Sequence, residues 1–185
     1  MHSEIKYSKE SITTARLILR LAVPEDAEAI FAYRSHPVTN RYQGWIPESV
    51  EEVREALKAN TPDRPDRWLQ FTIVEAAENK VIGDVSMHYT SATQMQAEIG
   101  CALDRQYHRQ GYAEEAVRAL LDYLFRMLQL HRAEVSIDPR NVATTRLAER
   151  LGFRKEGLFI ENFWLRGEWV DSVVYAILQR EWKGL

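Results

Sequence analysis

The stretch RQYHRQGYAEEAVRAL, from Arg105 to Leu120, decides the fold. Basic residues and Gln110 lead into Gly111, and an amphipathic pattern begins directly after this glycine. Free N–H groups at a helix N-terminus attract anions, so the backbone of residues 109–113 is predicted to form a concave nest for a diphosphate. The alternative is a plain turn at Gly111 flanked by solvated basic residues, and a short glycine motif alone leaves both interpretations open.

Apolar residues continue the pattern beyond this stretch. They recur at the i, i+3, i+4, i+7 spacing of a helix that buries one face, and they predict a helix of about four turns. These residues are Ala113, Ala116, Val117, Leu120, Leu121, Leu124, Phe125 and Leu128.

Strand and helix signals alternate through the rest of the chain. Strands are predicted at 14–23, 68–75, 80–89, 97–103 and 131–138, with two more in 157–178 joined by a hairpin at 166–168. Helices are predicted to start at Pro24, at Ser49 with a capping box to Glu52, and at Asn141, and 61–67 is predicted to be a loop. The order β-α-α-β-β-β-α-β-α-β-β predicts an α+β fold, with a mixed, mostly antiparallel sheet and helices on both faces.

Composition narrows the class of protein. A length of 185 residues, with 45% hydrophobic and 28% charged residues, predicts one globular domain over 1–185. The lone Cys101 excludes an internal disulfide and a cysteine-rich metal site, which favours the cytoplasm. A net charge of -3 disfavours nucleic-acid binding and agrees with an amine substrate. The polar N-terminus is not a secretory signal, and no apolar run predicts a membrane span.

A second motif, DPRNVATTRLAERLGFRKEG at 138–157, follows the first. Together the two resemble the GNAT superfamily of acetyl-CoA-dependent N-acetyltransferases. The family's pyrophosphate motif, Gln/Arg-x-x-Gly-x-Gly/Ala, is matched by His108-Arg109-Gln110-Gly111-Tyr112-Ala113, with His108 departing from it. The Rim-type branch, which acetylates ribosomal proteins, is matched by Asn141, Thr144, Leu151-Gly152-Phe153 and Glu156-Gly157. The resemblance runs from Ala15 to the C-terminus.

The resemblance implies that acetyl-CoA is the co-substrate and that no metal is needed. It also implies a splayed pair of strands, with the pantetheine arm pairing with backbone near Cys101 and Leu103 like an added strand. The residues expected to bind the co-substrate are Cys101, Leu103, His108, Arg109, Gln110, Gly111, Tyr112, Ala113 and Asn141.

Catalytic roles follow from the same resemblance, each beside a structural alternative. Glu98 is the first candidate for general base, and its structural alternative is a strand residue that faces solvent. Thr144 occupies the place of a Ser that protonates the departing thiolate, and its structural alternative is a hydrogen bond to the local backbone. Asn141 is an excellent helix cap in any case. Cys101 is expected to pack rather than to carry an acyl group. A tyrosine donor of other branches falls at Ala148, so that donor is absent.

The acceptor site is the least determined part. Tyr42, Trp45 and Phe163 are expected to line it, although large aromatic residues are more often core. Phe163 stands where some relatives have a second base, and Glu161 is expected two residues earlier on the same strand face. The resemblance implies that the acceptor is an amine, which is expected to be a protein N-terminal α-amine, or alternatively a polyamine, amino sugar or aminoglycoside. A non-catalytic acyl-CoA-binding regulator is a third hypothesis, and both monomer and homodimer are compatible with the family.

Overall fold

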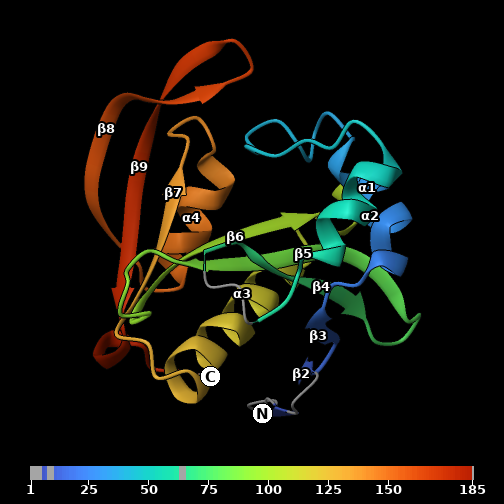
Figure 1. Cartoon of the computed structure of the whole chain (residues 1–185). Coiled ribbons are helices and arrows are strands. Elements are labelled where there is room, and N and C mark those ends of the chain that lie inside the picture. Colours follow the sequence, from blue (N-terminus) through green and yellow to red (C-terminus); the bar gives the residue numbers. More distant parts are fainter. Residues whose placement is uncertain (1–5, 8–10, 63–65, 185) are drawn as a thin grey trace.

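One sheet connects the strands of the computed structural model, which describes residues 6–7, 11–62 and 66–184. Its strand order is β1-β2-β3-β4-β5-β6-β7-β9-β8, and every neighbouring pair is antiparallel except β6 and β7 (Figure 1). The strands are β1 Lys6–Tyr7, β2 Ser11–Thr13, β3 Leu17–Leu21, β4 Leu69–Glu75, β5 Lys80–Tyr89, β6 Gln96–Leu103, β7 Arg132–Ile137, β8 Arg154–Leu165 and β9 Glu168–Leu178.

Four α-helices occur in the described part of the chain: α1 Ala27–Arg34, α2 Val50–Lys58, α3 Tyr112–Asp122 and α4 Val142–Arg150. The predicted α+β order is confirmed, and the structure adds two short strands before it. The expected strand 14–23 is shorter than predicted, because the Thr14 N–H donates to the Leu17 carbonyl at 2.9 Å and turns the chain back from β2 into β3. Part of the expected loop 61–67 and most of the polar N-terminus lie outside the described residues.

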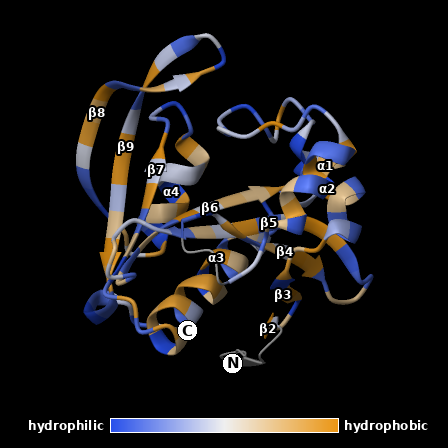
Figure 2. Ribbon diagram, in the orientation of Figure 1, coloured by the Kyte–Doolittle hydropathy of each residue, from blue (hydrophilic) through white to orange (hydrophobic). Residues whose placement is uncertain are grey.

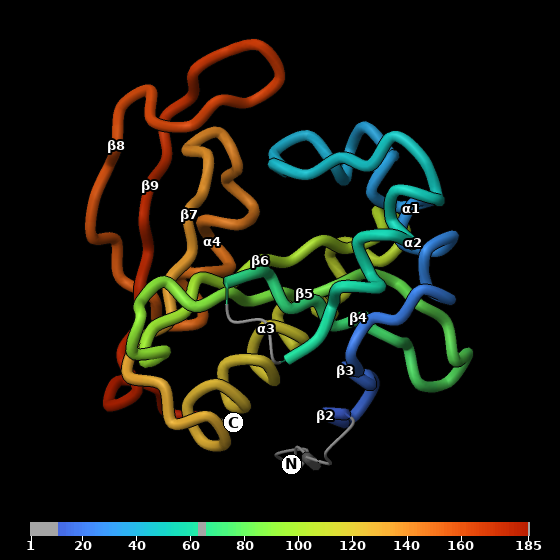
Figure 3. The backbone as a smooth tube through the Cα atoms, viewed as in Figure 1, coloured from blue at the N-terminus to red at the C-terminus, as the bar shows by residue number. Residues whose placement is uncertain are grey.

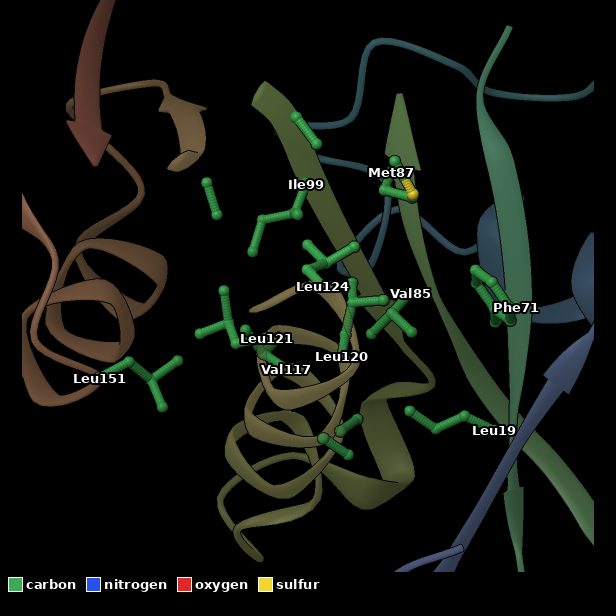
Figure 4. Close-up of a cluster of buried hydrophobic side chains, with 14 of the residues drawn as sticks. Leu19, Phe71, Val85, Met87, Ile99, Val117, Leu120, Leu121, Leu124 and Leu151 are labelled. Carbon is green, nitrogen blue, oxygen red and sulfur yellow. The ribbon is translucent and has the colours of Figure 1, made fainter. Parts of the chain in front are cut away.

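Two hydrophobic cores lie on opposite faces of the sheet. The larger joins the strands to α3 and α4, where Leu120, Leu121 and Leu124 point toward Val85 and Ile99 (Figure 4). The smaller joins α1 and α2 to the other face. Figure 2 shows hydrophobic colour along the strands and α3, while the exposed face of α2 is hydrophilic. Helices therefore cover both faces, as predicted.

The α3 helix differs from its prediction in one respect. The regular α-helix ends at Asp122, and Tyr123–Met127 continue it as a wider π-helical turn in which the Leu128 N–H donates to the Tyr123 carbonyl at 3.0 Å. The spacing of apolar residues did not distinguish a regular α-helix from this π-helical turn, because Leu124 and Phe125 are buried here as the α-helical pattern also predicted.

The sheet splits between β6 and β7. These parallel strands pair only through Gln96, Ala97 and Glu98, opposite Arg132, Ala133 and Glu134. Beyond Glu98 the rest of β6 keeps β5 as a partner but has none on the other side. The splayed pair that the family resemblance implied is present.

The β8–β9 hairpin and the segment between α1 and α2 rise on opposite sides of this split (Figure 3). The hairpin turns at Arg166 and Gly167, whose φ angles of 51° and 87° suit the two-residue turn that matches strand twist. Arg166 donates hydrogen bonds to the carbonyl and the side-chain oxygen of Asn40, the latter at 2.7 Å. The two walls are thus tied together above the sheet.

Candidate active site

The split in the sheet opens into a cleft of about 970 Å³. Its floor comes from residues of β5 and β6, and its walls from the α1–α2 segment, β7, the start of α4 and the β8–β9 hairpin. Lining residues include Tyr42, Gln43, Trp45, Trp68, Gln70, His88, Glu98, Cys101, Ser136, Asn141, Thr144 and Phe163. Segments far apart in sequence therefore meet at one site.

The backbone of β6 presents hydrogen-bonding groups to this cleft. The Asp104 N–H donates to the Ile82 carbonyl at 2.8 Å, and the Gln96 carbonyl accepts from Thr90 N–H at 3.0 Å, so even-numbered residues of β6 bond toward β5. Because N–H and C=O of one residue point the same way in an antiparallel strand, Cys101 and Leu103 point their backbone groups away from β5. A linear ligand can pair with them as a strand does.

Two carbonyls on that edge already accept hydrogen bonds from the protein. Gln43 Nε2 donates to the Cys101 carbonyl at 3.2 Å, and His108 Nε2 lies 2.9 Å from the Leu103 carbonyl. His108 therefore closes the β6–α3 loop onto its own strand. Its place in the pyrophosphate motif is used for this internal bond, which is a physical reason for the departure from Gln or Arg.

The Cys101 thiol lies beneath the strand, against the larger core. Burial, with a further contribution from the charge of Asp84, raises the pKa of this thiol to about 12. A thiolate is the nucleophilic form of cysteine. The side chain is therefore suited to packing, in line with the expectation from sequence.

The loop before α3 has the shape of an anion nest. Arg109 and Gly111 adopt φ angles of 61° and 82°, so two left-handed residues turn successive N–H groups toward the helix start. A Cβ at Gly111 would lie 3.3 Å from Arg16 Nη2. Arg16 donates to the Gln110 carbonyl at 3.0 Å and pairs with Glu115 at 2.7 Å, which adds a guanidinium that the sequence did not connect with this loop.

Glu98 occupies the point where β6 and β7 separate. Its carboxylate oxygen Oε2 lies 3.1 Å from His88 Nε2, and both side chains are about a quarter exposed, at 26% and 27%. The hydrogen bond with Glu98 raises the pKa of His88 above its usual value, opposed by partial burial and reinforced by the Tyr89 carbonyl and the charge of Glu134. His88 also lines the cleft, although it was not among the site residues predicted from sequence.

The start of α4 brings Asn141 and Thr144 to the opposite wall. Asn141 caps the helix, since its Oδ1 accepts from the Thr144 N–H at 3.3 Å. Both residues line the cleft. The cap alternative for Asn141 is confirmed.

Of the expected acceptor residues, Tyr42, Trp45 and Phe163 line the cleft and Glu161 does not. The expectation that Glu161 and Phe163 share a strand face is wrong. Between Phe159 and Phe163 the β8 register shifts against β9, and Glu161 takes a φ of 47° with its N–H donating to Asp171 at 2.8 Å. A bulge breaks the two-residue alternation on which that expectation depended.

Arg34, which sequence reasoning did not single out, supports the cleft wall formed by the segment between α1 and α2. It forms a two-pronged ion pair with buried Asp84, at 2.6 and 3.0 Å, and its guanidinium lies 5.0 Å from the Trp45 ring. Trp45 Nε1 donates to Glu52 at 3.0 Å, and Glu52 also accepts from the Glu48 N–H at 2.7 Å. The Glu52 carboxylate therefore accepts hydrogen bonds from the loop before α2. In the predicted capping box it would instead accept from the Ser49 N–H.

Comparison with known proteins identifies the family. The model of the acetyltransferase (GNAT) domain matches residues 16–154, more than half of the chain. The chain belongs to the GNAT acetyltransferase family. It is 32% identical over 171 residues to the uncharacterized N-acetyltransferase YnaD of Bacillus subtilis, covering 92% of this chain and 98% of YnaD. The GNAT-family acetyltransferase structure from Bacillus anthracis superposes with a TM-score of 0.81 at 28% identity, covering 98% of this chain and all of that one.

Two relatives of this acetyltransferase are named for their acceptors. The [ribosomal protein uS5]-alanine N-acetyltransferase of Escherichia coli is 25% identical over 185 residues, covering 94% of this chain and 93% of that protein. The spermidine N(1)-acetyltransferase of Vibrio cholerae is 27% identical over 135 residues, covering 73% and 76%. A structure of Vibrio cholerae spermidine N-acetyltransferase in complex with CoA and spermine has the same fold, with a TM-score of 0.80 at 24% identity over 90% of this chain and 98% of that one.

Among the described residues, no three or more His, Cys, Asp or Glu side chains cluster in a way that could hold a metal ion. In the same part of the chain, no helix has both the length and the apolar character needed to cross a membrane.

Proposed function

We propose that this N-acetyltransferase transfers an acetyl group from acetyl-CoA to the α-amine of a protein N-terminus by direct attack within a ternary complex. The observation that carries the proposal is the junction of β6 and β7, where the strand edge for the co-substrate and the Glu98 carboxylate meet in one cleft. An amine beside Glu98 lies next to a thioester held along β6.

Acetyl-CoA fits the residues on the co-substrate side. The diphosphate would occupy the nest formed by Arg109–Ala113, with Arg109 and Arg16 supplying positive charge. The pantetheine arm would pair with backbone at Cys101 and Leu103. The Cys101 carbonyl keeps a second lone pair beyond its bond from Gln43, so a ligand amide can also bond there.

The proposed reaction assigns each group a separate task. Glu98 takes a proton from the acceptor ammonium, and the amine attacks the thioester carbonyl. A backbone N–H on the unpaired edge of β6 stabilises the oxyanion. Thr144, at the opposite wall, donates to the departing thiolate and regains its proton from the amide nitrogen through solvent. Asn141 keeps the α4 terminus in place.

A peptide acceptor is supported by the polar groups of the cleft. Among the described residues, Gln70 Nε2 is the buried side-chain polar atom without a hydrogen-bond partner, and Gln70 lines the cleft. This amide N–H needs an oxygen, which a peptide carbonyl supplies and a fully protonated polyamine lacks. Arg67 lies among the acidic lining residues, so the cleft is not a purely acidic pocket for polycations.

A small polyamine is the second candidate, and one observation favours it. Tyr42, Trp45, Trp68 and Phe163 line the cleft together with Glu98 and Asp171, and aromatic faces beside carboxylates attract ammonium groups. The spermidine acetyltransferase relative gives this alternative weight.

Release of free thiol from acetyl-CoA distinguishes the two candidates. One acceptor pool contains peptides with free N-termini, a matched pool contains the same peptides N-acetylated, and a third contains spermidine and spermine. We expect thiol release with the free peptides alone. Release with the polyamines alone would overturn the peptide assignment.

A matched pair of tryptophan variants locates the acceptor. Trp45→Ala is expected to raise the acceptor KM and leave the acetyl-CoA Kd unchanged, because Trp45 lines the acceptor wall. Trp169→Ala is the control, since Trp169 is exposed on the hairpin and packs on Trp164 at 5.3 Å outside the cleft lining. Equal effects of the two variants on acceptor KM would contradict the placement.

A further inference from the structure

His88 and Glu98 form a pair that crosses two neighbouring strands at the junction of the split. They are direct partners in the β5–β6 register, and His88 Nε2 lies 3.1 Å from Glu98 Oε2. The Trp68 ring meets the His88 ring edge-on, with centroids 4.3 Å apart. Packing against Trp68 and bonding to Glu98 together fix the orientation of the imidazole.

The other ring nitrogen determines how many protons the pair can hold. His88 Nδ1 lies 3.2 Å from the Tyr89 carbonyl oxygen. The Tyr89 carbonyl and the Glu98 carboxylate only accept, and a neutral imidazole has a single N–H. With one proton the ring donates to one of these two oxygens, and with a second proton it donates to both.

Charged groups around the imidazole favour the presence of that proton. The carboxylates facing His88 are Glu98 on β6 and, farther away, Glu134 on β7, and both raise the pKa of His88. Trp68, packed on the ring from the segment before β4, contributes no charge. A single proton bound between two interacting groups titrates as a property of the pair.

We propose that His88 and Glu98 act as one base, which receives the proton of the acceptor ammonium and holds it between Nε2 and Oε2. This inference rests on the proposed amine acetylation. Before reaction the pair lacks the shared proton and has one negative charge. The ammonium gives one proton to the pair, the C–N bond forms and the C–S bond breaks. Of the two protons left on nitrogen, one stays on the amide and the other ends on the CoA thiol.

The pair suits this task better than a lone carboxylate. An isolated glutamate titrates near pH 4.3, so its conjugate acid is far stronger than an ammonium group. A general base works best when its proton affinity matches the working pH. An imidazole has a usual pKa of about 6.5, and the Glu98 hydrogen bond raises the pKa of His88, so the pair holds a proton more tightly than a lone carboxylate does. His88 acts through Glu98 and is a positioning residue.

A second hollow offers a way out for the proton. It has a volume of about 230 Å³, adjoins Glu98 on the β7–β9 side and is lined by Glu98, Glu134, Ser136, Phe159, Asn162, Ser172 and Val174. Most of these side chains are polar and can bond water. The shared proton can therefore leave on the side of Glu98 away from the acceptor wall.

Direct titration of the imidazoles tests the pair without any acceptor. Proton NMR of the wild-type protein, with His88→Gln to assign the signal, should show His88 titrating above pH 6.5, the usual midpoint of histidine. In Glu98→Gln the midpoint should fall, because the carboxylate that stabilises the shared proton is gone. A His88 midpoint that is the same in wild type and Glu98→Gln would overturn the pairing.

The dependence of kcat on pH tests the role in catalysis. The wild-type rising limb should follow the His88 midpoint. His88→Gln keeps a hydrogen-bond donor for Glu98 but cannot titrate, so the limb should move to lower pH and the plateau should fall at least about tenfold. His131→Gln is the control, since His131 is exposed in the turn before β7 and should reproduce the wild-type profile.

The contrary results are distinct. If the rising limb of the kcat profile is unchanged in His88→Gln, His88 has only a structural role. If the rising limb moves to higher pH, Glu98 is the base by itself and protonated His88 acts only as a neighbouring positive charge. Thermal unfolding of His88→Gln checks that the variant is folded. If no peptide causes thiol release from acetyl-CoA, the proposed peptide acceptor is wrong. The NMR titration still tests, independently of any acceptor, whether His88 and Glu98 share a proton.

Discussion

Replacing Arg34 with Met should destabilise the protein strongly, because it leaves a buried carboxylate without its cation. Asp84 is fully buried, at 0% exposure, and its two oxygens accept from Arg34 at 2.6 and 3.0 Å and from the Tyr33 hydroxyl at 2.6 Å. After the substitution the Tyr33 hydroxyl alone remains of these donors. Breaking a buried ion pair on one side costs about 3–5 kcal/mol.

Urea and thermal unfolding measure this cost. For a domain of this size about 1 kcal/mol shifts Tm by roughly 2–4 °C, so we expect a decrease of about 6–20 °C. Arg54→Met is the matched control, since Arg54 pairs with Glu51 on the exposed face of α2, and such pairs contribute about 0.5 kcal/mol. The double variant Arg34→Met/Asp84→Leu should recover most of the loss, because no buried charge remains.

The double variant also separates stability from function. Its stability should approach the wild type, yet Trp45 would still lack the guanidinium that packs 5.0 Å from its ring. The acceptor KM should then rise while the acetyl-CoA Kd stays the same. A cost below about 1 kcal/mol for Arg34→Met, or additive losses in the double variant, would refute this account of the pair.

Substitutions at four further positions test the remaining parts of the site. Residue 111 has a φ of 82°, and a Cβ there would lie 3.3 Å from Arg16 Nη2, so Gly111→Val should cost about 1–3 kcal/mol in strain. The substitution should also weaken acetyl-CoA binding measured by calorimetry. An unchanged Kd would contradict the placement of the diphosphate at this loop. Cys101→Ser should leave kcat within the same order of magnitude, whereas an acetylated wild-type protein in the mass spectrum would contradict direct transfer. Asn141→Ala should cost about 1 kcal/mol and raise the acetyl-CoA KM, with Asn141→Ser retaining the cap. Hydrogen bonds from Arg140 lower the pKa of Asp138 below its unfolded value, so this carboxylate stabilises the fold above about pH 3.9 and loses that effect as pH falls. The stability difference between wild type and Arg140→Gln in urea should therefore shrink from pH 7 to pH 3, and a constant difference would contradict the linkage.

Local signals predicted the geometry around the starts of α3 and α4 well. The cap at Asn141, the left-handed Gly111 and the amphipathic face of α3 each depend on residues within a few positions of one another. Their geometry follows from backbone sterics and from the free N–H groups at a helix start. The splayed strands were predicted only through the family resemblance, since no local pattern shows where two parallel strands separate.

Contacts that join distant segments were predicted less completely. Arg16 reaches Glu115 across 99 positions beside the loop before α3, and Tyr33 reaches Asp84 across 51. The bulge at Glu161 depends on a bond from its N–H to Asp171 on the neighbouring strand. A charged residue within a predicted strand, such as Asp84, was the sequence signal that could have indicated these contacts. A carboxylate in an otherwise apolar strand needs a buried partner.

The alignment of His88 with Glu98 follows from the packing of the opposite face of the sheet. Along β5 and β6, Val85, Met87 and Ile99 enter the core beneath α3, while the residues between them form the cleft floor. A slip of one residue would exchange the two sets and bury the charged groups. Burial of a side chain such as Met87 stabilises the fold by about 1.5–3 kcal/mol, so the same contacts that stabilise the protein hold the imidazole opposite the carboxylate. Cavity-forming changes at Met87 should therefore affect the pH profile of kcat as well as stability.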